Sequence, residues 1–269
     1  MPDDKVFTGS IPEVYDRYLV PLIFEPYASD LAVRLAALKP LDVLETAAGT
    51  GVLTRAIMAR LASGVRLVAT DLNQPMLDQA AARQPGGSRV EWRQADALAL
   101  PFEDQQFDAV VCQFGAMFFP DKIQGYREAR RVLRPGGHFV FNVWDRIAEN
   151  AFAEVVTDAL KSVFPEDPPN FMARTPHGHH DVAKIREELA AAGFSSVSAE
   201  TLDHISRAAS PRDVAIAYCQ GTPLRNEIVA RDPSRLEEAT QCAADALARR
   251  FGNGPIEGPI RAHVMMAVR

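Results

Sequence analysis

Short apolar runs alternate with amphipathic stretches between residues 41 and 143 of the chain. Each apolar run is dense in Val, Leu and Phe, which is typical of strands that are buried on both faces of a sheet. The predicted strands span residues 41–46, 65–70, 89–94, 107–113 and 138–143. The predicted helices between them span residues 52–61, 75–83 and 123–133, where apolar side chains recur at helical spacing. This alternation predicts an α/β fold with a doubly wound, mostly parallel sheet.

Helical patterns flank this region on both sides. Residues 10–38 carry apolar side chains at helical spacing, and Pro21 and Pro26 are expected to break this helix into pieces. After the fifth strand, helices are expected at residues 151–164 and 182–192, separated by a loop rich in proline and histidine. The N-terminal helices, residues 1–40, are expected to form a helical cap together with two later insertions, residues 146–180 and 208–257.

The rest of the chain completes the predicted core, which comprises residues 41–145, 181–207 and 258–269. A sixth strand is expected at residues 196–207 and a last strand at residues 260–268, bounded by Gly258-Pro259. The insertion between them has two helix starts, Ser210-Pro211 and Asp232-Pro233, each a capping residue followed by proline.

Composition narrows the class of protein. The chain has 269 residues, of which 47% are apolar, and this suffices for a large core in one domain or in a domain with a cap. A net charge of −6 disfavours nucleic acid and anionic lipid as partners. The three cysteines lie far apart and form no metal or redox spacing, so they are expected to be reduced thiols in a cytoplasmic protein. No apolar segment is long enough to span a bilayer. We therefore expect a cytoplasmic protein, monomeric or homodimeric, without a nucleic-acid or membrane partner.

A small-residue loop follows the first predicted strand. Gly49 and Gly51 allow a sharp turn and a close approach of a ligand to the backbone. The unpaired N–H groups that begin the next helix favour an anionic or zwitterionic ligand. The alternative is a tight turn between strand and helix, as any α/β protein contains.

Polar residues also stand at the ends of the next three predicted strands. Asp71 ends the second strand, where a carboxylate can accept hydrogen bonds from the hydroxyl groups of a ribose. Asp96 and Ala97 follow the third strand, where a carboxylate beside a backbone N–H can bind the edge of an adenine. Gln113 ends the fourth strand. Asp71 has an alternative role as the cap of the helix that follows Pro75.

Taken together, five stretches resemble class I S-adenosylmethionine-dependent methyltransferases, in the small-molecule group that is similar to the ubiquinone and menaquinone biosynthesis C-methyltransferases. The matching stretches occur in the family order within residues 41–145. They are VLETAAGTG at 43–51, ATDLNQPML at 69–77, QADALALPF at 94–102, FDAVVCQ at 107–113 and EARRVLRPGG at 128–137. The resemblance implies a Rossmann-like, seven-stranded sheet whose last strand is antiparallel, with S-adenosylmethionine as the cofactor and S-adenosylhomocysteine as the product.

The resemblance also implies which residues hold the cofactor. The methionine part lies on the glycine-rich loop, the ribose on the acid after the second strand, and the adenine between an apolar side chain and the pair after the third strand. The expected residues are Glu45, Ala47, Gly49, Thr50 and Gly51; Asp71, Leu72 and Met76; Asp96, Ala97 and Leu98; and Gln113. Ala47 stands where glycine is usual.

Two other functions remain as alternatives to methyl transfer. A nicotinamide-dependent oxidoreductase needs a third glycine after Gly49 and Gly51, and Thr54 occupies that position. A protein that binds the cofactor without catalysis would carry the same motifs. The segment Gln113-Phe114-Gly115 lacks the Asn/Asp-Pro-Pro-aromatic signature of base methylation. The expected acceptor is therefore an oxygen, carbon or nitrogen atom of a small, partly apolar metabolite.

Three residues are candidates for the general base that an oxygen or carbon acceptor requires. They are His177, His179 and Tyr18; histidine titrates near neutral pH. The run His177-Gly178-His179-His180 also has an alternative interpretation as metal ligands, but the spacing dictates no further ligand and we predict no metal.

Overall fold

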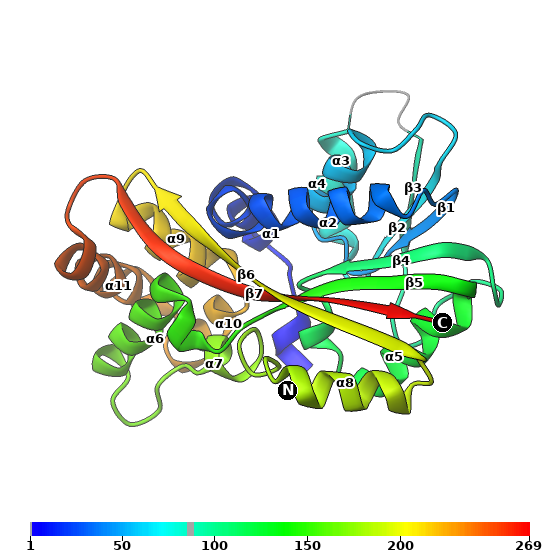
Figure 1. Ribbon diagram of the computed structural model, residues 1–269. Helices are drawn as coiled ribbons and strands as arrows, with labels where there is room; N and C mark the ends of the chain where they lie inside the picture. Colours follow the sequence, from blue (N-terminus) through cyan, green and yellow to red (C-terminus); the bar gives the residue numbers. More distant parts are fainter. Residues whose placement is uncertain (1, 85–88) are drawn as a thin grey trace. The chain divides into compact units, whose positions relative to one another are not determined.

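The computed structural model describes residues 2–84 and 89–269 (Figure 1). The chain forms two compact units. The first, here called the sheet unit, comprises Glu25–Val143, His180–Leu202 and Ala262–Arg269. The second, here called the helical unit, comprises Met1–Phe24, Trp144–His179 and Asp203–Arg261. Residues 25–40, grouped with the N-terminal helices by their pattern, thus belong to the sheet unit.

Seven strands form one sheet in the order β3-β2-β1-β4-β5-β7-β6. The strands are β1 (Asp42–Glu45), β2 (Arg66–Asp71), β3 (Val90–Gln94), β4 (Phe107–Gln113), β5 (Leu133–Trp144), β6 (Ser196–Ala208) and β7 (Ile256–Val268). The first five strands pair in parallel, and β5, β7 and β6 are antiparallel neighbours. The order reverses between β1 and β4, so the predicted doubly wound, mostly parallel sheet is confirmed.

Two predicted strand starts are wrong, and local chemistry explains both. β5 begins at Leu133 instead of residue 138, because Leu133 already pairs with Phe107 before the register shifts. The intervening segment holds Gly136 at a φ of +78°. β7 begins at Ile256, so Pro259 lies inside a strand and does not precede it.

Proline is tolerated in β7 because of where its nitrogen points. The N–H and C=O groups of Arg261 face Asn150 and Asp145, beyond the last residue of β5. Pro259 lies two residues earlier and has the same orientation, so its missing N–H costs no ladder hydrogen bond to β5.

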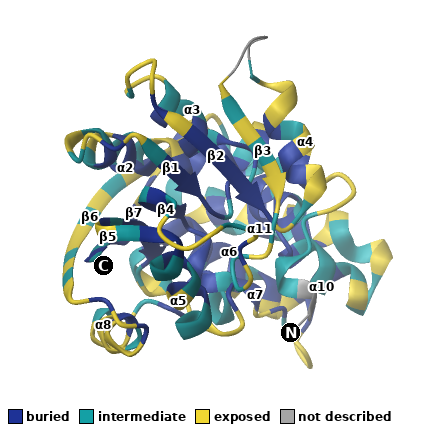
Figure 2. Ribbon diagram, turned by 90° about the vertical axis from the view of Figure 1, so that its right-hand side faces the viewer, coloured by how far each residue is buried: buried dark blue, intermediate teal, exposed yellow. Residues whose placement is uncertain are grey.

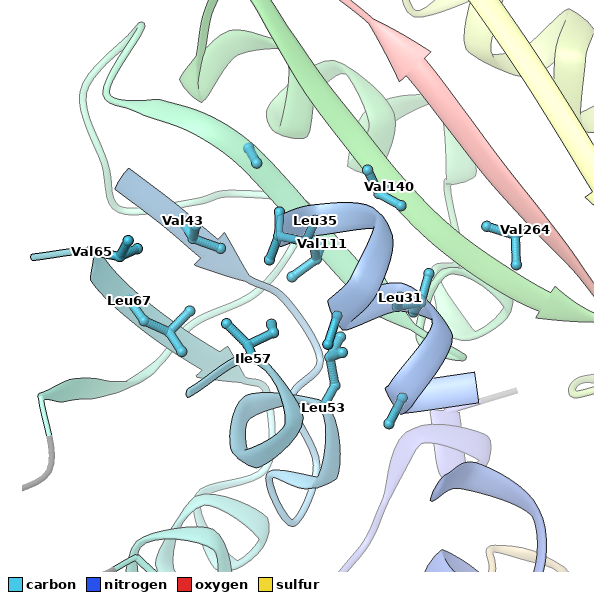
Figure 3. Packing of buried hydrophobic residues seen from close by; sticks show 13 residues of the cluster. Leu31, Leu35, Val43, Leu53, Ile57, Val65, Leu67, Val111, Val140 and Val264 are labelled. Atoms are coloured by element: carbon cyan, nitrogen blue, oxygen red, sulfur yellow. The ribbon is translucent and has the colours of Figure 1, made fainter. Parts of the chain in front are cut away.

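Helices cover the sheet of the sheet unit. They are α2 (Glu25–Ala37), α3 (Val52–Met58), α4 (Gln74–Ala82), η3 (Ala116–Phe118), α5 (Lys122–Val132) and α8 (Val182–Ala191). Leu31 and Leu35 of α2 point toward Leu53 and Ile57 of α3 in a buried cluster that includes Val43 of β1 (Figure 3). Burying each such side chain contributes about 1.5–3 kcal/mol. This cluster fixes α3, and with it the loop that precedes α3.

Burial of the strands follows their position in the sheet. β1 and β2 are buried along nearly their whole length, whereas β3 at the edge is largely exposed (Figure 2). The expectation that all strands are buried on both faces is therefore wrong for β3, because an edge strand lacks a neighbour on one side.

The helical unit contains most of the remaining helices. They are η1 (Pro2–Lys5), α1 (Ile11–Val14), η2 (Tyr15–Phe24), η4 (Ile147–Glu149), α6 (Ala151–Val163), α7 (Phe171–Arg174), α9 (Pro211–Gly221), α10 (Leu224–Arg231), η5 (Pro233–Arg235) and α11 (Leu236–Phe251). Ser210 and Asp232 cap α9 and η5 as predicted, accepting the N–H groups of Asp213 and Ser234. α7 and α10 were not predicted.

The expected helix breaks at Pro21 and Pro26 are not found. Helical residues run without interruption from Ile11 to Ala37 through α1, η2 and α2. Pro21 lies within η2, which is a π-helix, and this wider turn is one way in which a helix accommodates a residue without an N–H. Among the residues that the structure describes, no helix is long and apolar enough to cross a membrane.

Candidate cofactor-binding site

The register of the sheet unit brings the predicted polar residues into one row. Asp71 lies opposite Gln94, and Gln113 lies opposite Asn142. Asp71 and Gln113 each lie two residues beyond the residue that pairs with Glu45. Neighbouring residues in a parallel sheet point to the same face, and alternate residues along a strand do so as well. The strand ends therefore present Gln94, Asp71, Gln113 and Asn142 on one face of the sheet, and these four residues are called here the polar row.

The loop after β1 turns through left-handed backbone conformations. Ala47, Gly49 and Gly51 have φ angles of +53°, +57° and +79°. A Cβ on Gly51 would lie 3.0 Å from Trp92 and 3.2 Å from Ala80, so both φ and space require glycine there. Ala47 adopts the left-handed conformation at a cost of about 1 kcal/mol. Gly51 therefore lets this loop pack closely against Trp92 and Ala80.

Asp71 connects this loop to the end of β2. Its Oδ2 accepts the N–H of Gly49 at 2.9 Å, and its Oδ1 accepts the N–H of Asn73 at 2.8 Å. Burial raises the pKa of the Asp71 carboxyl, and the N–H donors of Asn73 and Gly49 oppose that shift. Asn73, not Asp71, is the N-cap of α4, so the capping alternative for Asp71 is wrong.

Glu45 is a buried carboxyl group at the end of β1. Its Oε2 accepts a hydrogen bond of 2.6 Å from the Thr54 hydroxyl, and its backbone oxygen accepts one of 3.0 Å from the Thr70 hydroxyl. Burial raises the pKa of Glu45 to about 8. Thr54, which occupies the position of the third dinucleotide-fold glycine, thus holds Glu45 through its side chain.

The predicted adenine-binding residues follow β2 and β3. The N–H of Ala95 donates to the Asp71 backbone oxygen at 3.0 Å, and Asp96 Oδ1 accepts the N–H of Leu98 at 2.9 Å. Met76 is buried, whereas Leu72 is 39% exposed. Asp96 is exposed and Ala97 half-buried, so this edge is open to solvent.

The turn after β4 packs against the glycine-rich loop. Phe114 has a φ of +50°, and its N–H donates to Asn142 Oδ1 at 2.9 Å. A Cβ on Gly115 would lie 2.4 Å from the Cβ of Ala47 and 2.7 Å from the Cys112 sulfur. Sequence reasoning missed Asn142; the signal was one asparagine inside the apolar run of β5.

Two buried polar atoms near this site need a partner. Thr50 Oγ1 and Asn142 Nδ2 are buried and have no hydrogen-bond partner among the described residues. Buried polar groups are nearly always satisfied, by protein, water or ligand. The Asp71 and Asp96 carboxylates are acceptors suited to the hydroxyl and amino groups of a ligand such as S-adenosylmethionine.

The candidate bases all belong to the helical unit. His177 is buried, and its Nδ1 lies 2.8 Å from the backbone oxygen of Asp145. A carbonyl only accepts, so Nδ1 donates a proton in this hydrogen bond. His179 is also buried, and the half-buried ring of Tyr18 lies 5.0 Å below the Arg17 guanidinium carbon. Across the described ranges, no group of three or more His, Cys, Asp or Glu could hold a metal.

The sheet order, the glycine-rich loop and the polar row define a nucleoside-binding, doubly wound α/β protein. Comparison with known proteins sharpens this class. A family model described as a methyltransferase domain matches residues 44–141. The chain is 43% identical over 98 residues to the demethylmenaquinone methyltransferase of Clavibacter sepedonicus, which covers 36% of this chain and 39% of the relative. The match thus spans less than half of that relative.

A second relative matches over a longer stretch. The chain is 35% identical over 170 residues to the demethylmenaquinone methyltransferase of Mycolicibacterium vanbaalenii, covering 60% of this chain and 71% of the relative. Phosphoethanolamine N-methyltransferase 2 of Haemonchus contortus, solved with S-adenosyl-L-methionine, has a similar fold at 17% identity, with a TM-score of 0.58 over 96% of this chain and 56% of that one. This chain belongs to the class I S-adenosylmethionine-dependent methyltransferase family, and the nicotinamide-dependent alternative is set aside.

Proposed function

We propose that the protein transfers the methyl group of S-adenosylmethionine to an oxygen, carbon or nitrogen atom of a small, partly apolar metabolite. The observation that carries this proposal is the polar row, in which Asp71 and Gln113 flank a loop that turns through left-handed Ala47, Gly49 and Gly51. The related proteins whose names describe quinone-precursor methylation support an acceptor that is a small molecule.

In this proposal each part of the cofactor has its own residues. Asp71 binds the ribose hydroxyls through its two oxygens, in place of or beside the N–H groups of Gly49 and Asn73 that it now accepts. The methionine part lies on the loop of Glu45, Ala47, Gly49, Thr50 and Gly51, with Gln113 beside it. The adenine lies between Leu72, Met76 and the segment of Asp96, Ala97 and Leu98.

The chain's own residues contribute alignment and proton transfer. The sulfonium of the bound cofactor supplies an electrophilic methyl group. Holding an acceptor in line with that group, away from water, is the main task that remains for the protein. His177 is the first candidate for the base, because its Nδ1–H is fixed by the Asp145 carbonyl, which would leave Nε2 to accept the proton. His179 and Tyr18 are the other candidates.

Acceptor recognition is assigned in this proposal to the helical cap, formed by residues 1–24, 146–180 and 208–257, because residues 25–40 belong to the sheet unit. These segments differ most from the strand and helix alternation of the cofactor-binding part. The proposal includes a cytoplasmic protein, monomeric or homodimeric, without nucleic-acid or membrane partners. The net charge of −6 supports the absence of anionic partners, and the three free cysteines support a reducing compartment.

The proposal is tested by product formation. Purified protein is incubated with S-adenosylmethionine and a panel of phenols, quinols, amines and carboxylates, and S-adenosylhomocysteine is measured by mass spectrometry. We expect its release with at least one acceptor, and lower turnover with unchanged cofactor binding in His177→Phe, His179→Phe or Tyr18→Phe. Cofactor binding without product across the panel would favour the non-catalytic alternative. Unaltered turnover in all three variants would remove these residues as bases.

A further inference from the structure

A partly buried group of charges lies beside the turn that carries His177. Asp4 receives two hydrogen bonds from Arg174, from Nη2 to Oδ1 at 2.5 Å and from Nε to Oδ2 at 3.2 Å. The Thr175 hydroxyl donates to the same carboxylate at 2.6 Å. The Asp4 side chain is only 13% exposed. This bidentate geometry restricts the orientation of Arg174 more than a single charge contact would.

A second carboxylate holds the same arginine from α10. Glu227 Oε1 lies 2.7 Å from Arg174 Nη2, while Glu227 Oε2 accepts the N–H groups of Asn170 and Phe171 at 2.8 and 3.1 Å. Those N–H groups begin α7, whose last residue is Arg174. The short helix α7 is therefore held at both ends by side chains from distant parts of the helical unit.

The His177 turn is built directly on α7. The N–H of His177 donates to the Met172 backbone oxygen at 3.0 Å. A Cβ on Gly178 would lie 2.0 Å from the Arg174 backbone oxygen, so the turn lies against the end of α7. The imidazole itself is tied to the Asp145 backbone oxygen. A shift of α7 would therefore lengthen the hydrogen bond that sets which ring nitrogen carries the proton.

We propose that Arg174 is a positioning residue: its pairing with Asp4 and Glu227 fixes α7 and thereby keeps the His177 ring in the Nδ1–H form, with Nε2 as the proton acceptor. The expected effect on methyl transfer rests on the proposed role of His177 as the base, whereas the positioning of the His177 ring by Arg174 does not. A purely stabilising role predicts that the variants lose stability while the protonation of the His177 ring and the kcat of the folded protein stay unchanged.

The test uses Arg174→Lys and Asp4→Asn in the full chain. Lysine keeps the charge but cannot pair with both carboxylates through a planar fork. Long-range proton–nitrogen NMR reports the protonation of each His177 ring nitrogen in the free protein. The methylation assay gives kcat, and calorimetry gives the dissociation constant of S-adenosylmethionine. Arg207→Lys is the matched control, since Arg207 pairs with Glu257 at the surface of the same unit with 66% and 62% exposed side chains.

We expect mixed protonation of Nδ1 and Nε2 in both variants, a fall in kcat of about tenfold or more, and cofactor affinity within about twofold of wild type. The Arg207 control should match wild type. Unchanged His177 nitrogen signals in both variants would overturn the proposal. Altered signals with unchanged kcat would support the positioning of the ring by Arg174 and would refute the proposed role of His177 as the base.

Discussion

The sheet unit and the helical unit hold their polar groups in different ways. In the sheet unit, backbone register and nearby donors place the carboxylates: Gly49 and Asp71 are 22 residues apart, and Glu45 and Thr54 are 9 apart. In the helical unit, side chains from remote segments hold each other: Asp4 and Arg174 are 170 residues apart. The first arrangement depends on backbone conformation at a few glycines, and the second on complementary charges and amides.

This difference predicts which substitutions affect cofactor binding and which affect only the helical unit. Changes at the carboxyl ends of the strands in the sheet unit should alter stability and S-adenosylmethionine affinity together. Changes in the helical unit should alter stability, or the geometry of His177, while the affinity for the cofactor is retained.

The largest effect is expected from Glu45→Gln as a function of pH. The folded pKa of Glu45, raised by burial to about 8 from 4.5, means that folding favours the protonated carboxyl. Its contribution to stability is therefore fully present below the unfolded pKa and is lost as pH rises through the folded value. Between about pH 5 and about pH 9, the free energy of unfolding of wild type should fall by about 4 kcal/mol relative to the variant.

Urea titrations at the two pH values measure this change. The exposed residue Glu103 provides the control, because Glu103→Gln should leave the pH dependence of wild type intact. Parallel stability profiles for wild type and Glu45→Gln would show that Glu45 is not a neutral, buried carboxyl in the free protein.

Gly115→Ala should be the next most damaging change. Its methyl group would overlap Ala47 and the Cys112 sulfur, so the turn after β4 must move away from the glycine-rich loop. We expect a loss of about 2–3 kcal/mol in stability and about tenfold or more in S-adenosylmethionine affinity. Gly64→Ala is the control, because a Cβ there meets nothing within 4 Å. A double variant with Ala47→Gly should recover part of both losses; equal losses in the single and double variants would exclude this contact as the cause.

Asn150→Ala probes the helical unit. The buried Asn150 amide donates to the backbone oxygens of Asp145, Arg146 and Arg261, and its oxygen accepts the N–H of Arg261. Removing it takes the acceptor from the Arg261 N–H, at a cost of about 2 kcal/mol measured by urea unfolding. Asn150→Asp keeps the acceptor but sets a buried carboxylate oxygen against these three carbonyl oxygens, so it should lose at least as much. Cofactor affinity should stay within about twofold of wild type; a loss as large as that of Gly115→Ala would contradict the distinction between the two units.

The smallest effect is expected from Ala47→Gly. Glycine removes the left-handed strain of about 1 kcal/mol, but its freedom in the unfolded chain offsets part of that gain. We expect a net stabilisation of about 0.5 kcal/mol in thermal unfolding. Ala48→Gly, at a buried position without a positive φ, should instead destabilise. Destabilisation by Ala47→Gly would show that the Ala47 methyl contributes more by packing than it costs by strain.

The sequence allowed the first four strands to be predicted closely, because strand and helix patterns alternate with short connections that leave few alternatives. β1, β2, β3 and β4 lie within one residue of their predicted limits. The starts of β5 and β7 were missed because Gly136 and Pro259 resemble strand terminators. In the structure, the register shift near the start of β5 accommodates Gly136, and Pro259 lies in a part of β7 that extends beyond the end of β5. The unbroken helix through Pro21 was missed because no local signal distinguishes a π-helix from a break.

The sequence predicted which residues lie at the strand ends of the candidate site, but not the side-chain contacts between them. The position of Asp71 and Gln113 at the ends of β2 and β4 was predictable, because each directly follows or ends an apolar run. The contacts of Thr54 with Glu45 and of Asn142 with Phe114 require side-chain directions that the pattern does not give. The pairing of Asp4 with Arg174 joins distant segments, which only the folded chain brings together.

The most direct test of the central claim is isothermal titration of the purified protein with S-adenosylmethionine, S-adenosylhomocysteine and NAD, repeated with Asp71→Ala. The polar row predicts micromolar binding of both adenosyl ligands, its loss in the variant, and no binding of NAD. Binding of NAD, or failure of both adenosyl ligands to bind the folded wild-type protein, would contradict the account.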